Sequence, residues 1–240
     1  MPNTYFFSDV HLGMKSSKLE RVKERRLLSF LDHVAGHGER LFILGDLFEF
    51  WFEYRTVIPR GHMKVLSALV RLRELGLDVH YVAGNHDFWM RDFFSRELDI
   101  TVHFEPLDIT LDGKRFFLHH GDGIAANDGG YRLMKRIFRY PPNITLYSLI
   151  HPDLGIPLAK WVSNLSRNHS QHEGPPTDRD YRAMAKARFG EGFDYAIFGH
   201  IHYPNIQEYG PKTYVSLGDW IDHFTYALFD GEQLQLHYWK

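Results

Sequence analysis

The sequence predicts an α/β fold in which a largely parallel sheet is covered by helices. Between residues 4 and 82, short β-rich runs alternate with longer stretches whose apolar residues recur at helical spacing. The run at Leu41–Leu44 is apolar throughout, which is typical of a strand that is buried on both faces. The order strand, helix, strand, helix, strand indicates parallel strands that are joined by crossover helices.

Each of the other elements in this half has a local reason to form. Thr4–Ser8 and Val79–Val82 consist largely of residues that favour strands. Lys18–Val34 and Met63–Leu75 carry apolar residues at helical spacing, which predicts one buried face for each helix. The second of these stretches is followed by Gly76, a residue type that commonly ends helices.

The second half is predicted to add two hairpins, two further strands and an insertion. Asp112-Gly113 and Asp230-Gly231 each stand between two β-rich runs, a strong signal for a tight hairpin turn. The strands expected here cover residues 108–111, 115–119, 194–198, 214–217, 224–229 and 233–238. Residues 128–176 interrupt this pattern with helical segments that are broken by prolines. We therefore expect an inserted helical cap at 128–176 within one domain that spans residues 1–240.

Composition narrows the class of protein. The chain has no cysteine, which excludes disulfides, iron–sulfur clusters and cysteine nucleophiles. Its 28 basic and 30 acidic residues give a net charge of −2, so we expect no nucleic-acid partner. We find neither an apolar run of membrane-spanning length nor a signal peptide, and we expect a cytoplasmic protein. The chain has 16 histidines, a large number for a residue that is the commonest metal ligand.

Five of the predicted strands end in residues that can bind a metal ion. Sheets of this class bind ligands beyond the carboxyl ends of their strands, where loops from different strands meet. A simple turn would explain any one of these strand ends, but coincidence is a poor explanation of all five. The side chains that we expect to converge are Asp9, His11, Asp46, Asn85, His120, His200 and His202.

The types of donor indicate the kind of metal centre. Imidazole nitrogens with carboxylate and amide oxygens, and no sulfur, suit Mn, Fe or Zn better than Ca or Cu(I). Seven donors are too many for one tetrahedral site. If one carboxylate bridges, the set serves two ions with four bonds each and leaves positions open for water and substrate. Two ions about 3.5–4 Å apart stabilise the attacking and leaving oxygens of a phosphoryl displacement, which indicates a hydrolase.

The motifs around these donors occur in a fixed order along the chain. They are Asp9-x-His11, Gly45-Asp46, Gly84-Asn85-His86-Asp87, His120-Gly121 and Gly199-His200-x-His202. As an ordered set over residues 9–202, they resemble the calcineurin-like metallophosphoesterase superfamily. The resemblance implies a sandwich of two sheets that is flanked by helices, with the helical cap inserted into it.

The same resemblance implies a role for each donor. One ion would be held by Asp9, His11, Asp46 and His202. The other would be held by Asn85, His120 and His200, with Asp46 as the bridge. His86, oriented by Asp87, would stabilise the transferring phosphoryl group or protonate the leaving oxygen.

Further motifs are similar to one branch of that superfamily. They are Gly45–Trp51, Gly84–Phe88, His120-Gly121-Asp122 followed by Asp128 and Tyr131, and Leu217–Trp220. These motifs resemble the UDP-2,3-diacylglucosamine pyrophosphatases of lipid A biosynthesis, which release UMP and 2,3-diacylglucosamine 1-phosphate. The resemblance implies two divalent ions, Mn²⁺ first and Fe or Zn as alternatives, and a lipid-linked uridine nucleotide as substrate. The substrate contacts that it implies are Asn85, His86, Asp128, Tyr131 and Ser166.

Some positions depart from the pattern of that branch. His86 stands where the best-known members carry Arg, and Ser170 and Glu173 stand where they carry Asn and Lys. Glu49 stands where many members of the superfamily have Asp. A divergent branch is one interpretation. The alternative is another metal-dependent phosphodiesterase or phosphomonoesterase with a water-soluble substrate. A third hypothesis, an inactive scaffold, is disfavoured because every ligand is present.

The predicted cap is basic and rich in apolar residues. From residue 131 to residue 167 it has six basic residues against one acidic residue, interleaved with aliphatic and aromatic side chains. Such a surface suits an anionic substrate with acyl chains, or peripheral contact with an anionic membrane, which would be the cytoplasmic face of the inner membrane. The alternative is that the apolar residues only pack the cap onto the body and that the basic residues face solvent.

Overall fold

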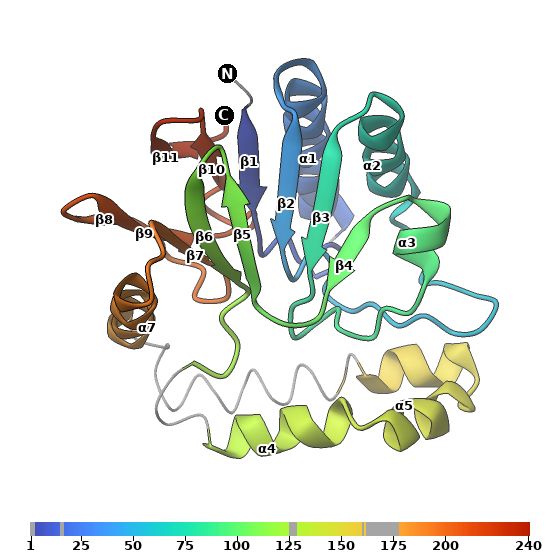
Figure 1. Ribbon diagram of the computed structural model, residues 1–240. Coiled ribbons are helices and arrows are strands. Elements are labelled where there is room, and N and C mark those ends of the chain that lie inside the picture. The colour runs from blue at the N-terminus through green and yellow to red at the C-terminus, as the bar shows by residue number, and fades with distance from the viewer. Residues whose placement is uncertain (1–2, 15–16, 125–128, 160, 162–177) are drawn as a thin grey trace.

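The computed structural model describes residues 3–14, 17–124, 129–159, 161 and 178–240. In these residues two sheets pack face to face, with helices on the outside (Figure 1). The first sheet has six strands in the order β11-β10-β1-β2-β3-β4, and the second has five in the order β5-β6-β7-β9-β8. The expected sandwich of two sheets flanked by helices is confirmed.

Parallel strands form the centre of each sheet. The first sheet consists of β1 (Thr4–Phe7), β2 (Arg40–Leu44), β3 (Asp78–Val82), β4 (Thr101–His103), β10 (Thr225–Phe229) and β11 (Leu234–Tyr238). The second consists of β5 (Leu107–Leu111), β6 (Lys114–His119), β7 (Tyr195–Phe198), β8 (Pro204–Tyr209) and β9 (Lys212–Leu217). Strands β1 to β4 run parallel, as do β6, β7 and β9, whereas β5, β8, β10 and β11 pair antiparallel.

Helices cover the outer faces of the sandwich and one of its ends. Helices α1 (Ser17–His37) and α2 (Met63–Glu74) lie on the first sheet, and the short α3 (Phe93–Glu97) lies beside β4 (Figure 1). Helix α7 (Asp178–Gly190) lies beside the second sheet. Helices α4 (Gly129–Phe138) and α5 (Pro141–Ser148), with a helical segment at 152–159, lie below the sheets. We call this last group the 129–159 helices.

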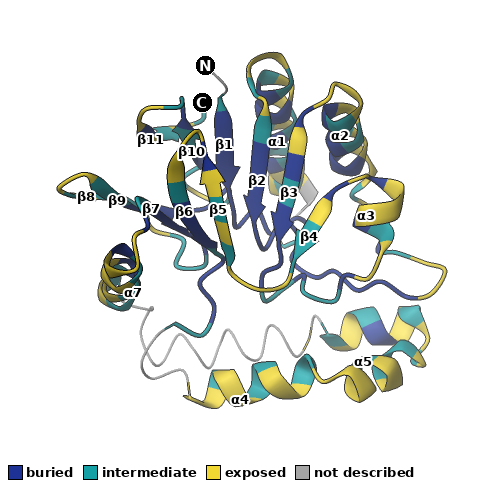
Figure 2. Ribbon diagram, in the orientation of Figure 1, coloured by how far each residue is buried: buried dark blue, intermediate teal, exposed yellow. Residues whose placement is uncertain are grey.

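Aromatic side chains hold the two sheets together. The ring of Phe6 in β1 lies 5.2 Å from that of Phe42 in β2 and 5.8 Å from that of Phe116 in β6. All three side chains are fully buried, and Figure 2 shows the central strands in the colour of buried residues. A second apolar core, which includes Phe30 and Leu69, joins α1 and α2 to the first sheet. The central strands are thus buried on both faces, and the loops that follow them stand on a closely packed frame.

The strands and helices expected in the first half all form, and so do both hairpins. Asp112 and Gly113 have φ values of 49° and 79°, the positive values that a tight hairpin turn requires. The sequence pattern did not predict α3, β4, β8 or α7. Strand β4 has only three residues, and β8 begins with a proline at the edge of its sheet, where apolar periodicity is weak.

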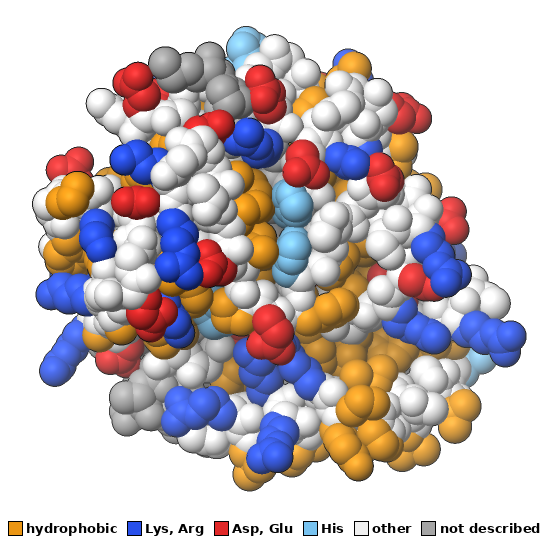
Figure 3. Space-filling model, viewed as in Figure 1, with side chains coloured by type: hydrophobic (Ala, Val, Ile, Leu, Met, Phe, Trp, Pro, Cys, Tyr) orange, Lys and Arg blue, Asp and Glu red, His pale blue; other side chains and the backbone are white. Residues whose placement is uncertain are grey.

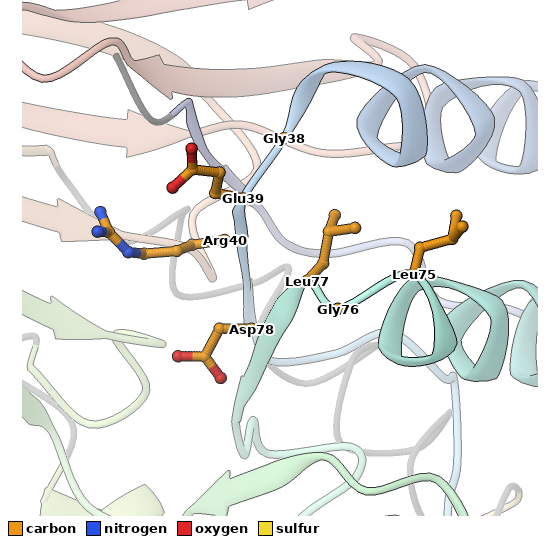
Figure 4. A pocket seen from close by; sticks show the side chains of 7 residues that line it. All are labelled: Gly38, Glu39, Arg40, Leu75, Gly76, Leu77 and Asp78. Atoms are coloured by element: carbon orange, nitrogen blue, oxygen red, sulfur yellow. The ribbon is translucent and has the colours of Figure 1, made fainter.

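A hollow of about 380 Å³ lies where β2 and β3 begin (Figure 4). It is lined by Gly38, Glu39, Arg40, Leu75, Gly76, Leu77 and Asp78. Arg40 forms an ion pair with Asp112 at 2.9 Å, and a carboxylate oxygen of Asp78 lies 2.9 Å from Nε2 of His80, so two of the charged side chains around the hollow already have partners. It contains none of the predicted donors, which follow the opposite ends of the strands.

None of the described helices is both long enough and apolar enough to cross a bilayer.

Candidate metal centre

Asp46, which directly follows β2 and Gly45, lies in the middle of the predicted donors. Its Oδ2 is 3.6 Å from Nε2 of His11 and 3.3 Å from Nε2 of His120. The same nitrogen of His120 lies 3.0 Å from Oδ1 of Asn85. A ring nitrogen of His200 lies within 4.8 Å of the ligand atoms of Asp46 and His120. Loops after β1, β2, β3, β6 and β7 therefore meet at one carboxylate.

Asp9, which follows β1, has an oxygen with unused bonding capacity. Its Oδ1 is buried and accepts no hydrogen bond, while its Oδ2 accepts one from the backbone N–H of His200 at 2.8 Å. Nε2 of His202 lies 3.3 Å from Oδ1 of Asp9 and 3.3 Å from Nε2 of His11. A buried carboxylate oxygen without a donor is costly, and two imidazole nitrogens that face each other need a proton or a cation between them. This arrangement fits a cation site.

Three overlapping groups of side chains have the spacing that a metal ion requires. They are Asp9, His11 and His202; His11, Asp46 and His86; and Asp46, His120 and His200. Asp46 belongs to two of the groups, as a bridging carboxylate would. Asp9, Asp46 and His120 are buried, whereas His200 and His202 are half-buried. The half-buried position of these two histidines leaves the described part of the site partly exposed to solvent.

Most of the donors have an uncommon backbone conformation. The five with positive φ are Asp9 (54°), His11 (49°), Asp46 (53°), His200 (70°) and His202 (55°). Few residues other than glycine adopt this region, although Asp and His are enriched among those that do. Bonds between neighbouring loops maintain these turns: the N–H of His11 donates to the Asp46 carbonyl at 2.9 Å, and that of Asp9 to Gly45 at 3.1 Å. Strain of this kind concentrates at functional sites.

Charges within the cluster already balance one another. Burial disfavours a charged imidazole and by itself would lower the pKa of His11 and His120. The carboxylates of Asp9 and Glu49 beside His11, and that of Asp46 beside His120, have the larger effect. They raise the pKa of each histidine to about 10. Burial also works against ionised Asp46, yet the surrounding imidazoles hold its pKa below the usual value. Imidazole protons therefore supply the positive charge that a metal ion would bring, and a metal must displace them to bind.

A model of the family described as calcineurin-like phosphoesterase matches residues 2–204. The chain belongs to this family. Curated relatives include a UDP-2,3-diacylglucosamine hydrolase of Porphyromonas gingivalis, 34% identical over 97% of this chain and 95% of the relative. Another protein of that name, from Nitrosococcus oceani, is 30% identical over 90% of this chain and 87% of the relative. A solved archaeal phosphodiesterase structure, 12% identical, matches with a TM-score of 0.51 over 98% of this chain and 99% of that chain, which shows a shared fold.

Family membership and the donor groups together make this calcineurin-like phosphoesterase a metal-dependent hydrolase. The metals themselves are divalent ions, because this fold binds them and the nitrogen and oxygen donors fit them. The relatives and the shared fold confirm the resemblance that the ordered motifs indicated.

Residues outside the predicted set hold the donors in place. Nδ1 of His11 lies 3.1 Å from Oε2 of the buried Glu49, and the buried Lys23 donates to the His11 carbonyl at 2.6 Å. Nδ1 of His202 is 3.7 Å from Asp219. Such partners fix the orientation of ligand imidazoles. Glu49 and Asp219 stand in motifs that the sequence made visible, but their contacts with ligands were not predicted.

Replacing Glu49 with glutamine should weaken metal binding roughly 10-fold, because the carboxylate that accepts the Nδ1 proton of His11, and so directs Nε2 toward the metal, loses its charge. Titration calorimetry with Mn²⁺ measures the change. Glu97→Gln is a matched control, since Glu97 is exposed at the end of α3. Equal affinities in the Glu49 variant and the unchanged protein would show that this carboxylate does not support the metal ligand.

His86 and Asp87 occupy different surroundings. Nδ1 of His86 donates to the Glu49 carbonyl at 2.9 Å, and its ring centre is 4.8 Å from that of His11. The carboxylate of Asp87 is fully buried and accepts hydrogen bonds from the N–H of Gly84 at 2.9 Å and from the Tyr81 hydroxyl. This differs from the expectation that Asp87 orients His86, because the oxygens of Asp87 accept hydrogen bonds from Gly84 and Tyr81 instead. The contact that orients His86 is the Glu49 carbonyl.

The predicted substrate contacts are only partly visible. Asp128 and Ser166 lie outside the described residues. Tyr131 lies on α4, and its hydroxyl donates to Oδ2 of the buried Asp122 at 3.0 Å. Asn85 and His86 lie within the donor cluster.

Proposed function

We propose that this chain hydrolyses the pyrophosphate of UDP-2,3-diacylglucosamine, giving UMP and 2,3-diacylglucosamine 1-phosphate, and uses Mn²⁺. The observation that carries the proposal is the series of three overlapping donor groups, in which Asp46 lies with His11 in one group and with His120 and His200 in another. The curated relatives, which bear the name of this activity and align over most of their own length, support the choice of substrate.

We assign the donors to two ions that share the Asp46 carboxylate. Asp9, His11 and His202 complete the first site, in which the unpartnered Oδ1 of Asp9 gains a partner. Asn85, His120 and His200 complete the second. When bound, the two ions stabilise charge on the attacking and leaving oxygens of the phosphoryl displacement. Buried ligand residues such as Asp9, Asp46 and His120 surround this charge, and the low dielectric constant of a buried site strengthens each electrostatic interaction.

We assign His86 a direct role beside the reacting phosphoryl group. Its Nδ1 is committed to the Glu49 carbonyl, which leaves Nε2 to bond a phosphoryl or leaving-group oxygen. Burial lowers the pKa of His86, so the ring is neutral until it gains an anionic partner. Asp87 supports it at a distance, by holding the shape of the loop through Gly84.

Replacing His86 with alanine should lower kcat about 100-fold or more and leave the metal content near normal, because general acid–base and hydrogen-bonding groups contribute on this scale. Steady-state kinetics with metal analysis of the purified variant measure both quantities. The corresponding Asp46 variant is the reference, because it should lose metal. Equal loss of metal from the two variants would contradict this division of roles.

We propose that residues 128–176 form an inserted cap within a single domain, 1–240, and that the cap receives the acyl chains. The 129–159 helices attach to the body through aromatic contacts: the Tyr147 ring is 4.7 Å from that of Phe52 and 5.6 Å from that of Trp89. Other apolar side chains of these helices are exposed, namely Leu133, Ile137, Leu146, Leu149, Leu154 and Leu158. Hydrophobic side chains gather at the lower right of Figure 3. Packing onto the body thus accounts for one part of the apolar surface only.

The exposed part also suits peripheral contact with an anionic membrane. Basic residues are interleaved with it along the helices, and an amphipathic surface of this type binds at the lipid interface. We therefore propose that the protein works at the cytoplasmic face of the inner membrane, where a lipid-linked nucleotide is presented.

Product analysis tests the proposed activity. The purified protein with Mn²⁺ should release UMP from detergent-dispersed UDP-2,3-diacylglucosamine, and EDTA should abolish the release. Bis(p-nitrophenyl) phosphate and p-nitrophenyl phosphate serve as water-soluble comparisons. An intact lipid nucleotide together with rapid cleavage of a soluble ester would favour the alternative, a phosphodiesterase or phosphomonoesterase, which the histidine at position 86 keeps open.

A further inference from the structure

Arg139, which directly follows α4, reaches across to the loop that carries Asn85 and His86. Its Nη2 lies 3.5 Å from the Gly84 carbonyl oxygen, and its guanidinium carbon lies 4.9 Å from the centre of the Phe88 ring. Its backbone N–H donates to the carbonyl of Lys135 at 2.9 Å, which extends the helical turn. The guanidinium is therefore placed by contacts at both ends of the residue.

This guanidinium has hydrogen-bonding capacity that its observed contacts do not use. Its Nε is buried and has no hydrogen-bond partner among the described residues. The contact of Nη2 with Gly84 is long, and its distance of 3.8 Å from Oδ2 of Asp122 exceeds hydrogen-bond length. An arginine carries five N–H donors in a planar fork, and it binds phosphate oxygens in pairs. The guanidinium therefore has N–H donors available to bind an anion.

Arg139 stands next to the candidate metal centre. Gly84, whose carbonyl it contacts, packs so closely on Asp46 that a Cβ at this glycine would lie 2.1 Å from Oδ1 of Asp46. The neighbouring cation behaves differently: Nζ of Lys135 lies 2.6 Å from Oδ2 of the buried Asp122, which neutralises it. Of these two cations beside the loop, Lys135 makes the close contact with Asp122, whereas Arg139 approaches the same oxygen only to 3.8 Å.

We propose that Arg139 binds the second phosphate of the substrate, the one that is not attacked by water and leaves with the sugar. The inference rests on the proposed function, because it requires a pyrophosphate. Bound metal ions would neutralise the attacked phosphoryl group, and the charge of the adjoining phosphate would then need a cation from the protein. Arg139 supplies that cation from the 129–159 helices, across the loop that carries Asn85 and His86.

Calorimetric titration of the Mn²⁺-loaded protein with two soluble nucleotides tests this assignment. The ligands are UMP, which has one phosphate, and the non-hydrolysable α,β-methylene-UDP, which has two. In the unchanged protein the second phosphate should strengthen binding about 10-fold or more, as expected for a charge-assisted pair. Arg139→Ala should remove this advantage and leave the affinity for UMP within about twofold, and Arg139→Lys should restore part of it.

Arg136→Ala is the matched control, because Arg136 lies on α4, is exposed and carries the same charge. It should retain the full advantage of the second phosphate. The assignment is overturned if Arg139→Ala retains that advantage, if both ligands weaken equally in it, or if the unchanged protein does not distinguish them. Failure to cleave the lipid nucleotide would refute the proposed function instead, since these titrations involve neither lipid nor turnover.

Discussion

Replacing Asp46 with alanine should lower kcat/KM by at least 1000-fold. Its carboxylate lies within 3.6 Å of His11 and 3.3 Å of His120, and it belongs to two of the three groups that can hold a metal. Removing it weakens the binding of both ions, and the stabilisation of the attacking and leaving oxygens is lost with them. The N–H of His86 also donates to Asp46 Oδ1 at 2.9 Å, so the variant frees the loop after β3.

Two measurements separate this loss from general damage. The Asp46 variant should contain less metal than the unchanged protein. Its unfolding in urea should still be cooperative. Asp32→Ala is the control, because Asp32 is an exposed residue of α1 whose carboxylate pairs with the exposed Arg71 at 3.0 Å. Retention of both ions by the Asp46 variant would refute the shared-carboxylate assignment.

Replacing Gly45 with alanine should destabilise the protein by about 3 kcal/mol or more. Gly45 has a φ of 82°, a conformation that costs alanine about 1 kcal/mol. A Cβ there would also lie 2.5 Å from Nδ1 of His120 and 2.7 Å from the Cα of Gly84. The second contact is with backbone, which cannot rotate away, and overpacking of this kind costs about 1–3 kcal/mol. Metal affinity should fall as well, because His120 is displaced.

Gly76→Ala separates strain from the clash. Gly76 has a φ of 88°, close to that of Gly45, but a Cβ there would meet nothing within 4 Å. Its variant should therefore lose only about 1 kcal/mol and bind metal normally. Urea unfolding of both variants gives the comparison. Equal stability losses would mean that the close approach of His120 and Gly84 to Gly45 is relieved at no cost.

The sequence predicted a feature correctly where a single physical requirement determines the residue types of one short segment. Strands buried on both faces must be apolar throughout, so Leu41–Leu44 marked β2 and the chain positions directly after it. Parallel strands bring such positions to a common edge, and for this reason Asp9, Asp46 and His120 could be expected together before any coordinates. The same logic does not apply to β8, which lies at an edge and alternates between half-buried and exposed residues.

Contacts between distant residues are not determined by one short segment in this way. That Glu49 orients His11, or that Asp87 is turned toward Tyr81 and not toward His86, depends on which side of a loop each oxygen faces. Residues of the 129–159 helices show the same limit, since helical spacing could not tell that Tyr147 packs inward while Leu146 is exposed. The positive φ values of the donors were equally hidden, because Asp and His adopt several backbone conformations.

Those left-handed turns have a practical consequence for engineering. At roughly 1 kcal/mol each, the turns at Asp9, His11, Asp46, His200 and His202 together cost on the order of 5 kcal/mol, as much as many domains have in total. A screen for heat-resistant variants would be drawn to these positions, since glycine would relieve every one of them, and each such gain would delete a ligand. Selection for thermal tolerance alone would therefore erode catalysis, and a useful screen must score both properties in the same round.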